Sequence, residues 1–170
     1  MNSRIEERFV FRSILPEEAE EAAKIEEICF PPNEACTEAI MKERAETAPE
    51  LFLVAEDRKT GELAGFINGL GTREESLRDA FFKETELHDP AGETVMILGV
   101  DVLPAYRRQG LAREMMRQYA ERLKQQGHRR LVLTCLEGKV RMYETMGFRD
   151  HGLSQSCWGG EQWHEMSREV

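Results

Sequence analysis

The sequence predicts a single α+β domain that spans residues 1–170. Three observations support this prediction: apolar runs of strand length, segments whose apolar residues recur at helical spacing, and the lack of any repeat or low-complexity linker. The predicted order is a strand, two helices, an antiparallel run of strands, a helix, a strand, a helix and two final strands. A chain of 170 residues is long enough to bury one substantial core.

The first half of the chain begins with a strand at 8–13, predicted because Phe9 and Phe11 alternate with polar residues. A helix follows over 16–29, since Pro16 suits a first helical turn and apolar residues recur at helical spacing after it. The Phe30-Pro31-Pro32-Asn33 run ends this helix. The other elements predicted in this half are a helix at 37–46, two strands at 51–56 and 63–70 joined by a turn, and a short helix at 76–84.

The second half centres on a nearly all-apolar strand at 94–102, which we expect in the middle of the sheet with both faces covered. A helix is predicted at 113–126, because its apolar residues share one side and Gly127 ends it. The remaining predicted elements are a strand at 130–135, a short helix at 140–146 and an antiparallel pair at 150–156 and 162–167.

Composition and charge exclude several classes of function. Hydrophobic residues make up 41% of the chain and charged residues 32%, as in soluble globular proteins. No apolar run is long enough to span a bilayer, and the N-terminus has no apolar signal segment. The net charge of −9 disfavours nucleic acid as a partner and favours cationic small molecules.

The four cysteines, at positions 29, 36, 135 and 157, form no Cys-x-x-Cys pair and do not cluster with the histidines in sequence. We therefore predict no metal site and a reduced, cytoplasmic protein. Any of these cysteines can also serve as a small core residue.

The segment 98–112 predicts a phosphate or pyrophosphate site. It joins the apolar strand to the helix through an Arg-Arg-Gln-Gly turn, so that unpaired N–H groups and the positive helix end point one way. Gly110 has no Cβ, which lets a ligand approach the backbone, and Arg107 and Arg108 supply side-chain charge. The alternative is an ordinary turn with a solvated arginine pair.

Two motifs carry a resemblance to a known family. Val100-x-Val-x-Pro-x-Tyr-Arg-Arg-Gln-Gly-Leu-Ala112 resembles the acetyl-CoA motif of the GNAT N-acetyltransferases, and Met142-Tyr-Glu-Thr-Met-Gly-Phe148 resembles the family's second motif. Further segments, at 48–52, 73–77, 87–92 and 158–160, resemble the arylalkylamine (serotonin) N-acetyltransferase branch. The resemblance implies the GNAT fold: a central mixed, mostly antiparallel sheet flanked by helices, with splayed central strands.

The resemblance also implies acetyl-CoA as cosubstrate, with no metal. Pantetheine would lie between the strands at 94–102 and 130–135 and pair with the backbone there, and the turn and helix start would surround the pyrophosphate. The cofactor-binding residues implied are Val100, Asp101, Val102, Arg107, Arg108, Gln109, Gly110, Leu111, Ala112 and Arg113. Tyr143 would be the acid that protonates the departing thiolate; the alternative is a tyrosine that only packs a helix on the sheet.

The acceptor amine must lose a proton, and the sequence names no base for this step. An alkylamine with a pKa near 10.4 is only about one part in a thousand neutral at physiological pH. The positions that carry histidines in the serotonin enzymes are Met96 and Leu98 here, and neither side chain can accept a proton. Glu93, His88 and His164 are candidates, and loss of the proton to ordered water is the alternative.

The resemblance places Phe30, Pro31 and Trp163 at the acceptor pocket, where an aromatic wall suits an aryl ring or an ammonium. Thr134 ends its strand close to the expected acetyl group. Trp163 can instead be a core residue, and Cys135 is more simply a packing cysteine than a nucleophile.

We therefore predict a cytoplasmic N-acetyltransferase, a monomer or homodimer, that moves acetyl directly to a primary amine. Arylalkylamines are the favoured acceptors and polyamines are second. The rival classes are an acetyltransferase of protein N-termini or lysines and a non-catalytic module that binds acetyl-CoA. Nucleic acid and membranes are not expected as partners.

Overall fold

The computed structural model describes residues 3–170 and contains one seven-stranded sheet in the order β1-β2-β3-β4-β5-β7-β6. Neighbouring strands are antiparallel except β4 and β5, which are parallel. The strands are β1 (Phe9–Ser13), β2 (Phe52–Asp57), β3 (Leu63–Thr72), β4 (Thr94–Val102), β5 (Arg130–Cys135), β6 (Arg149–Leu153) and β7 (His164–Glu169). The helices are α1 (Ser3–Arg8), α2 (Ala19–Cys29), α3 (Glu38–Thr47), α4 (Leu111–Gln125) and α5 (Val140–Thr145).

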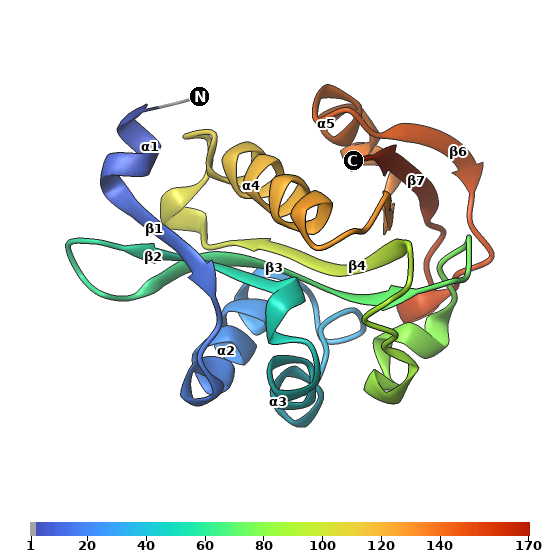
Figure 1. Cartoon of the computed structure of the whole chain (residues 1–170), viewed down its shortest axis with the longest axis horizontal. Helices are drawn as coiled ribbons and strands as arrows, with labels where there is room; N and C mark the ends of the chain where they lie inside the picture. Colours follow the sequence, from blue (N-terminus) through green and yellow to red (C-terminus); the bar gives the residue numbers. More distant parts are fainter. Residues whose placement is uncertain (1–2) are drawn as a thin grey trace.

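The helices cover both faces of the sheet (Figure 1). Helices α2 and α3 lie on one face, where Ile25 and Met41 pack against Phe66 in one apolar cluster. Helix α4 lies on the other face, and its residues Met115 and Leu123 belong to the larger apolar cluster. The near-continuous apolar run of β4 follows from this double cover. The predicted central, doubly covered strand is confirmed.

Strands β4 and β5 pair over only three residues, from Thr94 to Met96 on β4 and from Arg130 to Val132 on β5. Beyond Met96 the two strands separate, so the edge of β4 that faces β5 has no strand partner there. The register between β3 and β4 also shifts, because Asn68 pairs with Gly99 whereas Gly69 pairs with Ile97. This extra residue bends β4 at the point where it leaves β5. The predicted splayed central strands are confirmed.

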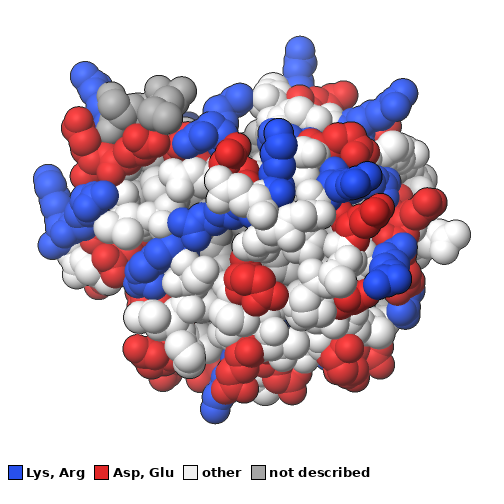
Figure 2. Space-filling model, viewed as in Figure 1, with Lys and Arg blue, Asp and Glu red and all other residues white. Residues whose placement is uncertain are grey.

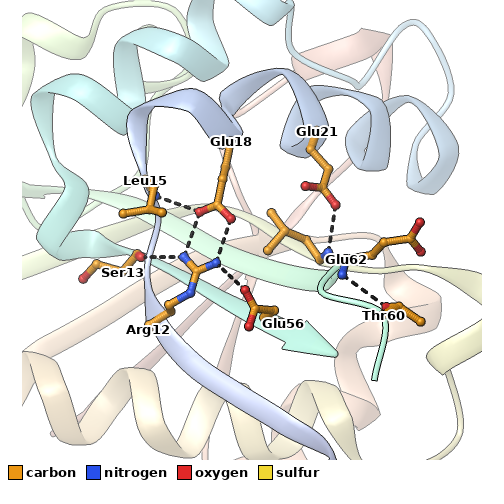
Figure 3. Close-up of polar contacts among 9 residues, drawn as sticks. Arg12, Ser13, Leu15, Glu18, Glu21, Glu56, Thr60 and Glu62 are labelled. Atoms are coloured by element: carbon orange, nitrogen blue, oxygen red, sulfur yellow. Dashed lines mark hydrogen bonds and ion pairs between the residues drawn. The ribbon is translucent and has the colours of Figure 1, made fainter. Parts of the chain in front are cut away.

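Arg12 on β1 anchors the start of the α2 segment to the sheet (Figure 3). Its Nη1 and Nη2 each donate to Glu18 at 2.7 Å, and Nη2 also donates to Glu56 on β2 at 2.9 Å. Glu18 in turn accepts from the N–H of Leu15 at 2.9 Å, and Glu21 accepts from the N–H of Leu63 on β3 at 2.8 Å. Charged hydrogen bonds at both points therefore fix α2 over the strands.

Three local predictions are wrong or incomplete. The helix predicted at 76–84 is absent: short 3-10 turns occupy Asp79–Phe82 and Thr85–Leu87. Tertiary bonds hold this backbone elsewhere, since Glu165 accepts from the N–H of Leu77 and Asp79 accepts from the hydroxyl of Ser156. Helix α1 was not expected, and α4 begins at Leu111, two residues before the predicted start. The other predicted elements are confirmed within about three residues at their ends.

Acidic side chains predominate along the lower edge of the view in Figure 2, where α2 and α3 lie in Figure 1. Such a surface attracts cations at long range. In the region 3–170, no helix is both long and apolar enough to cross a membrane.

Candidate functional site

The turn between β4 and α4 has an unusual backbone. Arg108 has a φ of 61° and Gly110 a φ of 83°, so two residues within three positions are left-handed. Most L-residues avoid this conformation, and Arg108 therefore carries local strain. Turns with left-handed residues direct successive N–H groups into a concavity that suits an anion. Gln109 between them accepts from Arg8, which ties the turn to α1.

The first turn of α4 presents free backbone donors. The first N–H bonded within this helix is that of Glu114, which donates to Gly110 at 3.0 Å. Within the described chain, the N–H groups of Leu111, Ala112 and Arg113 have no hydrogen-bond partner. Gly110, the N-cap residue, has no side chain that could occupy them. The helix start is therefore open to an anionic ligand.

A pocket of about 400 Å³ lies beside this helix start, between α4 and the end of α5. Gly110 and Thr145 line it, together with the guanidinium-bearing residues Arg113, Arg117 and Arg168. Arg117 is engaged with Glu114 at 2.6 Å, and Arg168 donates to the carbonyl of Met146 at 3.1 Å. Three guanidinium groups thus line a pocket that also contains Gly110 at the helix N-terminus.

The side chain of Arg107 does not point into the turn, where its charge was expected. Its Nε donates to the carbonyl of Val102 at 2.9 Å, and its guanidinium lies beside the thiol of Cys29 at the end of α2. Cys29 Sγ also donates to the Val102 carbonyl, at 3.3 Å. Arg107 therefore links the end of β4 to α2. Val100 and Val102 are half-buried on the part of β4 that pairs with β3 but not with β5.

Tyr143 on α5 is 8% exposed and packs edge-on against Phe148. Its hydroxyl makes no hydrogen bond within residues 3–170. Burial raises the pKa of Tyr143, and the nearby Cys135 and Asp101 raise it further. Tyr143 is therefore protonated at neutral pH and lies close to residues of both separated strands.

Cys135, at the end of β5, is buried and its Sγ contacts Met166 Sδ at 3.5 Å. Burial raises the pKa of this thiol to about 12, with a further contribution from Asp150. His164 pairs with Cys135 across the β5–β7 ladder, but its Nδ1 lies 3.1 Å from Asp150. The thiol is thus neutral at physiological pH, which does not favour it as a nucleophile.

The other candidate bases are placed outside the strand opening. His88 accepts from the N–H of Gly71 through Nδ1 and contacts Glu50 through Nε2, both at 2.9 Å, so both ring nitrogens are engaged. Glu93 is exposed and lies at the opposite end of β4 from the turn. Met96 and Leu98 are buried apolar residues.

The predicted acceptor residues lie on three elements. Phe30 is the half-buried C-cap of α2, Pro31 follows it and is exposed, and Thr134 is half-buried on β5. Trp163 precedes β7, is 8% exposed, and donates from Nε1 to the carbonyl of Trp158 at 2.8 Å. Trp163 is therefore well packed, and only a small part of it is open to solvent.

The loops that carry Phe30 and Trp163 contact each other. Asn33 donates to the carbonyl of Gly159 at 3.0 Å, and Trp158 donates from Nε1 to the carbonyl of Glu34 at 2.8 Å. The same contact brings the carboxyls of Glu34 and Glu161 together, which with burial raises the pKa of Glu34 to about 7. Two hydrogen bonds and a carboxyl contact therefore join the two loops.

The sequence interpretation missed a buried polar cluster beneath β4. Glu26 on α2, Asn68 on β3 and Asp101 on β4 are each at most 4% exposed, and each has an oxygen without a hydrogen-bond partner. Two signals in the sequence pointed to it: an aspartate inside the apolar run 94–102, and a glutamate on the apolar side of the helix at 16–29. Asp101 was predicted only as a cofactor-binding position.

No group of three or more His, Cys, Asp or Glu side chains within residues 3–170 is arranged to hold a metal ion.

Residues 18–148 match the model of the Acetyltransferase (GNAT) family. The chain belongs to this family. Comparison with curated proteins returned no match. The membership makes this protein an acyltransferase enzyme that uses acetyl-CoA.

Solved structures of GNAT proteins share the fold over nearly the whole chain. The loading GNATL domain of CurA from Lyngbya majuscula matches with a TM-score of 0.82 at 15% identity, over 95% of this chain and 97% of that one. A phosphinothricin acetyltransferase from Sinorhizobium meliloti, in complex with acetyl-CoA, matches with a TM-score of 0.68 at 16% identity, over 96% and 89%. The ribosomal-protein-S18-alanine N-acetyltransferase from Escherichia coli matches with a TM-score of 0.66 at 17% identity, over 95% and 94%. At these identities the similarity establishes the fold alone. The two named transferases act on different acceptors.

Proposed function

We propose that this GNAT enzyme transfers acetyl directly from acetyl-CoA to a primary amine, with arylalkylamines as the favoured acceptors. One observation carries the proposal: the hydroxyl of Tyr143 has no hydrogen-bond partner within residues 3–170, and it lies near residues of both β4 and β5 where these strands separate. A proton donor there suits a reaction whose leaving group is a thiolate.

The cofactor would be held mainly by backbone. The free N–H groups of 111–113 and the concave turn before them fit a diphosphate, and the unpartnered edge of β4 from 97 to 102 fits an extended pantetheine chain. Acetyl-CoA supplies the activated acetyl group. A backbone N–H near Val100 would stabilise the oxyanion that develops on the thioester carbonyl.

Tyr143 would donate its proton as the carbon–sulfur bond breaks. A thiol has an ordinary pKa of about 8.5, so the thiolate is a fair leaving group and the donor contributes about 10²–10³-fold in rate. The raised pKa of Tyr143 keeps it in the donating form. The neutral Cys135 thiol supports direct transfer over a covalent acetyl-enzyme.

The acceptor side is bounded by the two contacting loops, which carry Phe30, Pro31 and Trp163. Aromatic walls favour an aryl or ammonium group. A polyamine is the second candidate acceptor, and the adjacent carboxyls of Glu34 and Glu161 favour it because they attract additional positive charge.

A panel of tryptamine, spermidine and a short peptide, with thiol release as the readout, tests the proposal. We expect tryptamine to give the highest kcat/KM. Preference for spermidine would select the polyamine acceptor, preference for the peptide would select protein acetylation, and binding of acetyl-CoA without turnover would select a non-catalytic module.

We place the reaction in the cytoplasm, since all four cysteines are free thiols. We expect a monomer or homodimer.

A further inference from the structure

The buried polar cluster beneath β4 lies on the face of the sheet that α2 and α3 cover. Asn68 and Asp101 share this face with Phe66, the cross-strand partner of Asp101. Four oxygens of this cluster have no hydrogen-bond partner in the described part of the chain: both carboxylate oxygens of Asp101, Oε1 of Glu26 and Oδ1 of Asn68. Buried oxygens without partners are costly, so their persistence needs a reason.

These oxygens surround one point next to Gly99. A Cβ at this position would lie 3.0 Å from Oδ1 of Asp101, 3.3 Å from Oδ1 of Asn68 and 3.6 Å from Oε1 of Glu26. Three acceptor oxygens from three elements therefore converge on the backbone at Gly99. Converging oxygens of this kind suit a group that donates N–H or O–H protons.

The two carboxyls cannot both be ionised in this setting. Burial raises the pKa of Asp101 well above its usual range, and the adjacent Glu26 carboxyl raises it further. One proton shared between the two satisfies oxygens that otherwise lack a donor. The pair then carries one negative charge, which the buried guanidinium of Arg44 on α3 balances.

Other titratable groups face the pair from the elements around it. Cys29 lies on α2 and Cys36 follows α2, and burial raises the pKa of both thiols, which leaves them neutral. Tyr143 on α5 is near enough to Asp101 for the carboxyl to raise its pKa, and it is also neutral at physiological pH. The carboxyl pair is therefore the acidic group in this region whose oxygens lack hydrogen-bond donors within residues 3–170.

The cluster lies at the place where the chemistry is proposed. Gly99 is at the register shift of β4, three residues beyond the last pair with β5. Asp101 is near enough to Tyr143 to influence its titration. Of the other candidate bases, His88 has both ring nitrogens engaged and Glu93 lies at the far end of β4. His164 is held through Nδ1 by Asp150 at 3.1 Å.

We propose that Glu26 and Asp101 act as one unit that accepts the proton lost by the acceptor ammonium beside Gly99. This inference rests on the proposed function. The ammonium gives one proton to the shared-proton pair, directly or through one water, and the neutral amine attacks the thioester carbonyl. The carbon–sulfur electron pair goes to sulfur, Tyr143 protonates the thiolate, and the second nitrogen proton passes through water to the Tyr143 oxygen as the amide forms. The pair then releases its extra proton to solvent, so the net products are amide, thiol and one proton.

The test is the pH dependence of kcat/KM for Asp101→Asn and Glu26→Gln, measured by thiol release. Both changes keep size and remove the proton acceptor. We expect a loss of about 10²–10³-fold at pH 7. The loss should shrink by about tenfold per pH unit towards the acceptor's pKa near 10, because the neutral amine is then already present.

Asp57→Asn is the matched control. Asp57 is a buried aspartate in the same sheet, bonded to the hydroxyl of Tyr106 at 2.7 Å, and its removal should leave the shape of the pH profile unchanged. A purely structural role for the pair predicts loss of activity by the same factor at every pH. Wild-type profiles for both Asp101→Asn and Glu26→Gln would overturn the inference.

Wild-type enzyme gives a second test that needs no variant. The pH profile of kcat/KM is measured with two acceptors whose amine pKa values differ by about one unit. The apparent pKa of the acidic limb should be the same for both acceptors, because an enzyme group sets it. A limb that moves with the amine would overturn the inference. Acetyl-CoA affinity is measured alongside: failure of wild type to bind contradicts the proposed function, whereas normal binding with a moving limb contradicts the proton acceptor alone.

Discussion

Arg113, in the first turn of α4, holds Thr145, the last residue of α5, through two hydrogen bonds. Its Nη1 donates to the Thr145 carbonyl at 3.0 Å and its Nη2 to the hydroxyl at 2.9 Å. Both residues line the pocket beside the helix start. The contact therefore ties the helix that carries Tyr143 to the helix whose N-terminus is proposed to bind the diphosphate.

Arg113→Ala should raise the KM for acetyl-CoA by less than about tenfold, because the backbone donors remain when the side chain is lost. The free energy of unfolding should fall by about 1 kcal/mol, as expected for charged bonds at an exposed site. Arg141→Ala removes the same charge from the exposed side of α5 and should change neither quantity. Equal effects of the two changes, in steady-state kinetics and chemical denaturation, would show that the contact has no role.

Tyr143→Phe should lower kcat by about 10²–10³-fold and leave acetyl-CoA affinity within about twofold, since the ring still packs against Phe148. Tyr119→Phe is the control: the hydroxyl of Tyr119 donates to the carbonyl of Leu51 at 2.9 Å, away from the strand opening. That change should cost about 1 kcal/mol of stability and spare kcat. Full turnover by Tyr143→Phe would exclude the tyrosine as the acid.

The contact between Glu34 and Glu161 should make stability fall as pH rises. The pKa of Glu34 is raised to about 7 in the folded chain, so the folded state holds a proton that the unfolded state releases above its ordinary pKa near 4.5. This stabilisation is complete below pH 4.5 and is lost as pH rises through 7.

Glu161→Gln keeps a hydrogen-bonding group and removes the like charge, so its Tm at pH 8 should exceed that of wild type. The difference should vanish at low pH. Glu86→Gln, an exposed carboxyl elsewhere, should show no such trend. Thermal unfolding at pH 5 and pH 8 decides the point: parallel Tm values for wild type and Glu161→Gln would contradict the shared proton.

Arg12→Met should destabilise the fold by about 1 kcal/mol in chemical denaturation at pH 7, because the loss of the partly buried guanidinium removes the cationic partner of two carboxylates (Figure 3). Arg12 holds the pKa of Glu18 below its usual value, so this contribution is present above that value and is lost as pH falls through the folded pKa. Lys24→Met breaks only an exposed pair with Glu20 and should cost much less. An equal cost for both variants would contradict the anchoring role.

The fold followed from sequence wherever local pattern and burial agree. The apolar run at 94–102, the amphipathic segment after Gly110 and the Tyr143 motif each give the element and position that the structure has. The helix predicted at 76–84 failed because bonds from Glu165 and Asp79 to residues far away in sequence decide that backbone. Periodicity within a short window carries no information about such bonds.

The site followed only in part for the same reason. The phosphate corner lies within one segment, so it could be predicted from residue types and order. The pairing of Glu26 with Asp101 joins residues 75 positions apart and depends on how α2 lies across β4. The hydrogen bond from Arg107 to the Val102 carbonyl likewise depends on how closely α2 approaches the turn.

Titration calorimetry of acetyl-CoA into wild type, Gly110→Glu and Gly127→Glu tests the binding corner most directly. Both glycines are left-handed and lie at opposite ends of α4, so the two substitutions share strain and charge but only the first faces the proposed diphosphate. We predict that wild type and Gly127→Glu bind alike and that Gly110→Glu binds at least about 100-fold more weakly, about 2.7 kcal/mol. Absence of binding by wild type, or equal binding by all three proteins, would contradict the placement of acetyl-CoA at the start of α4.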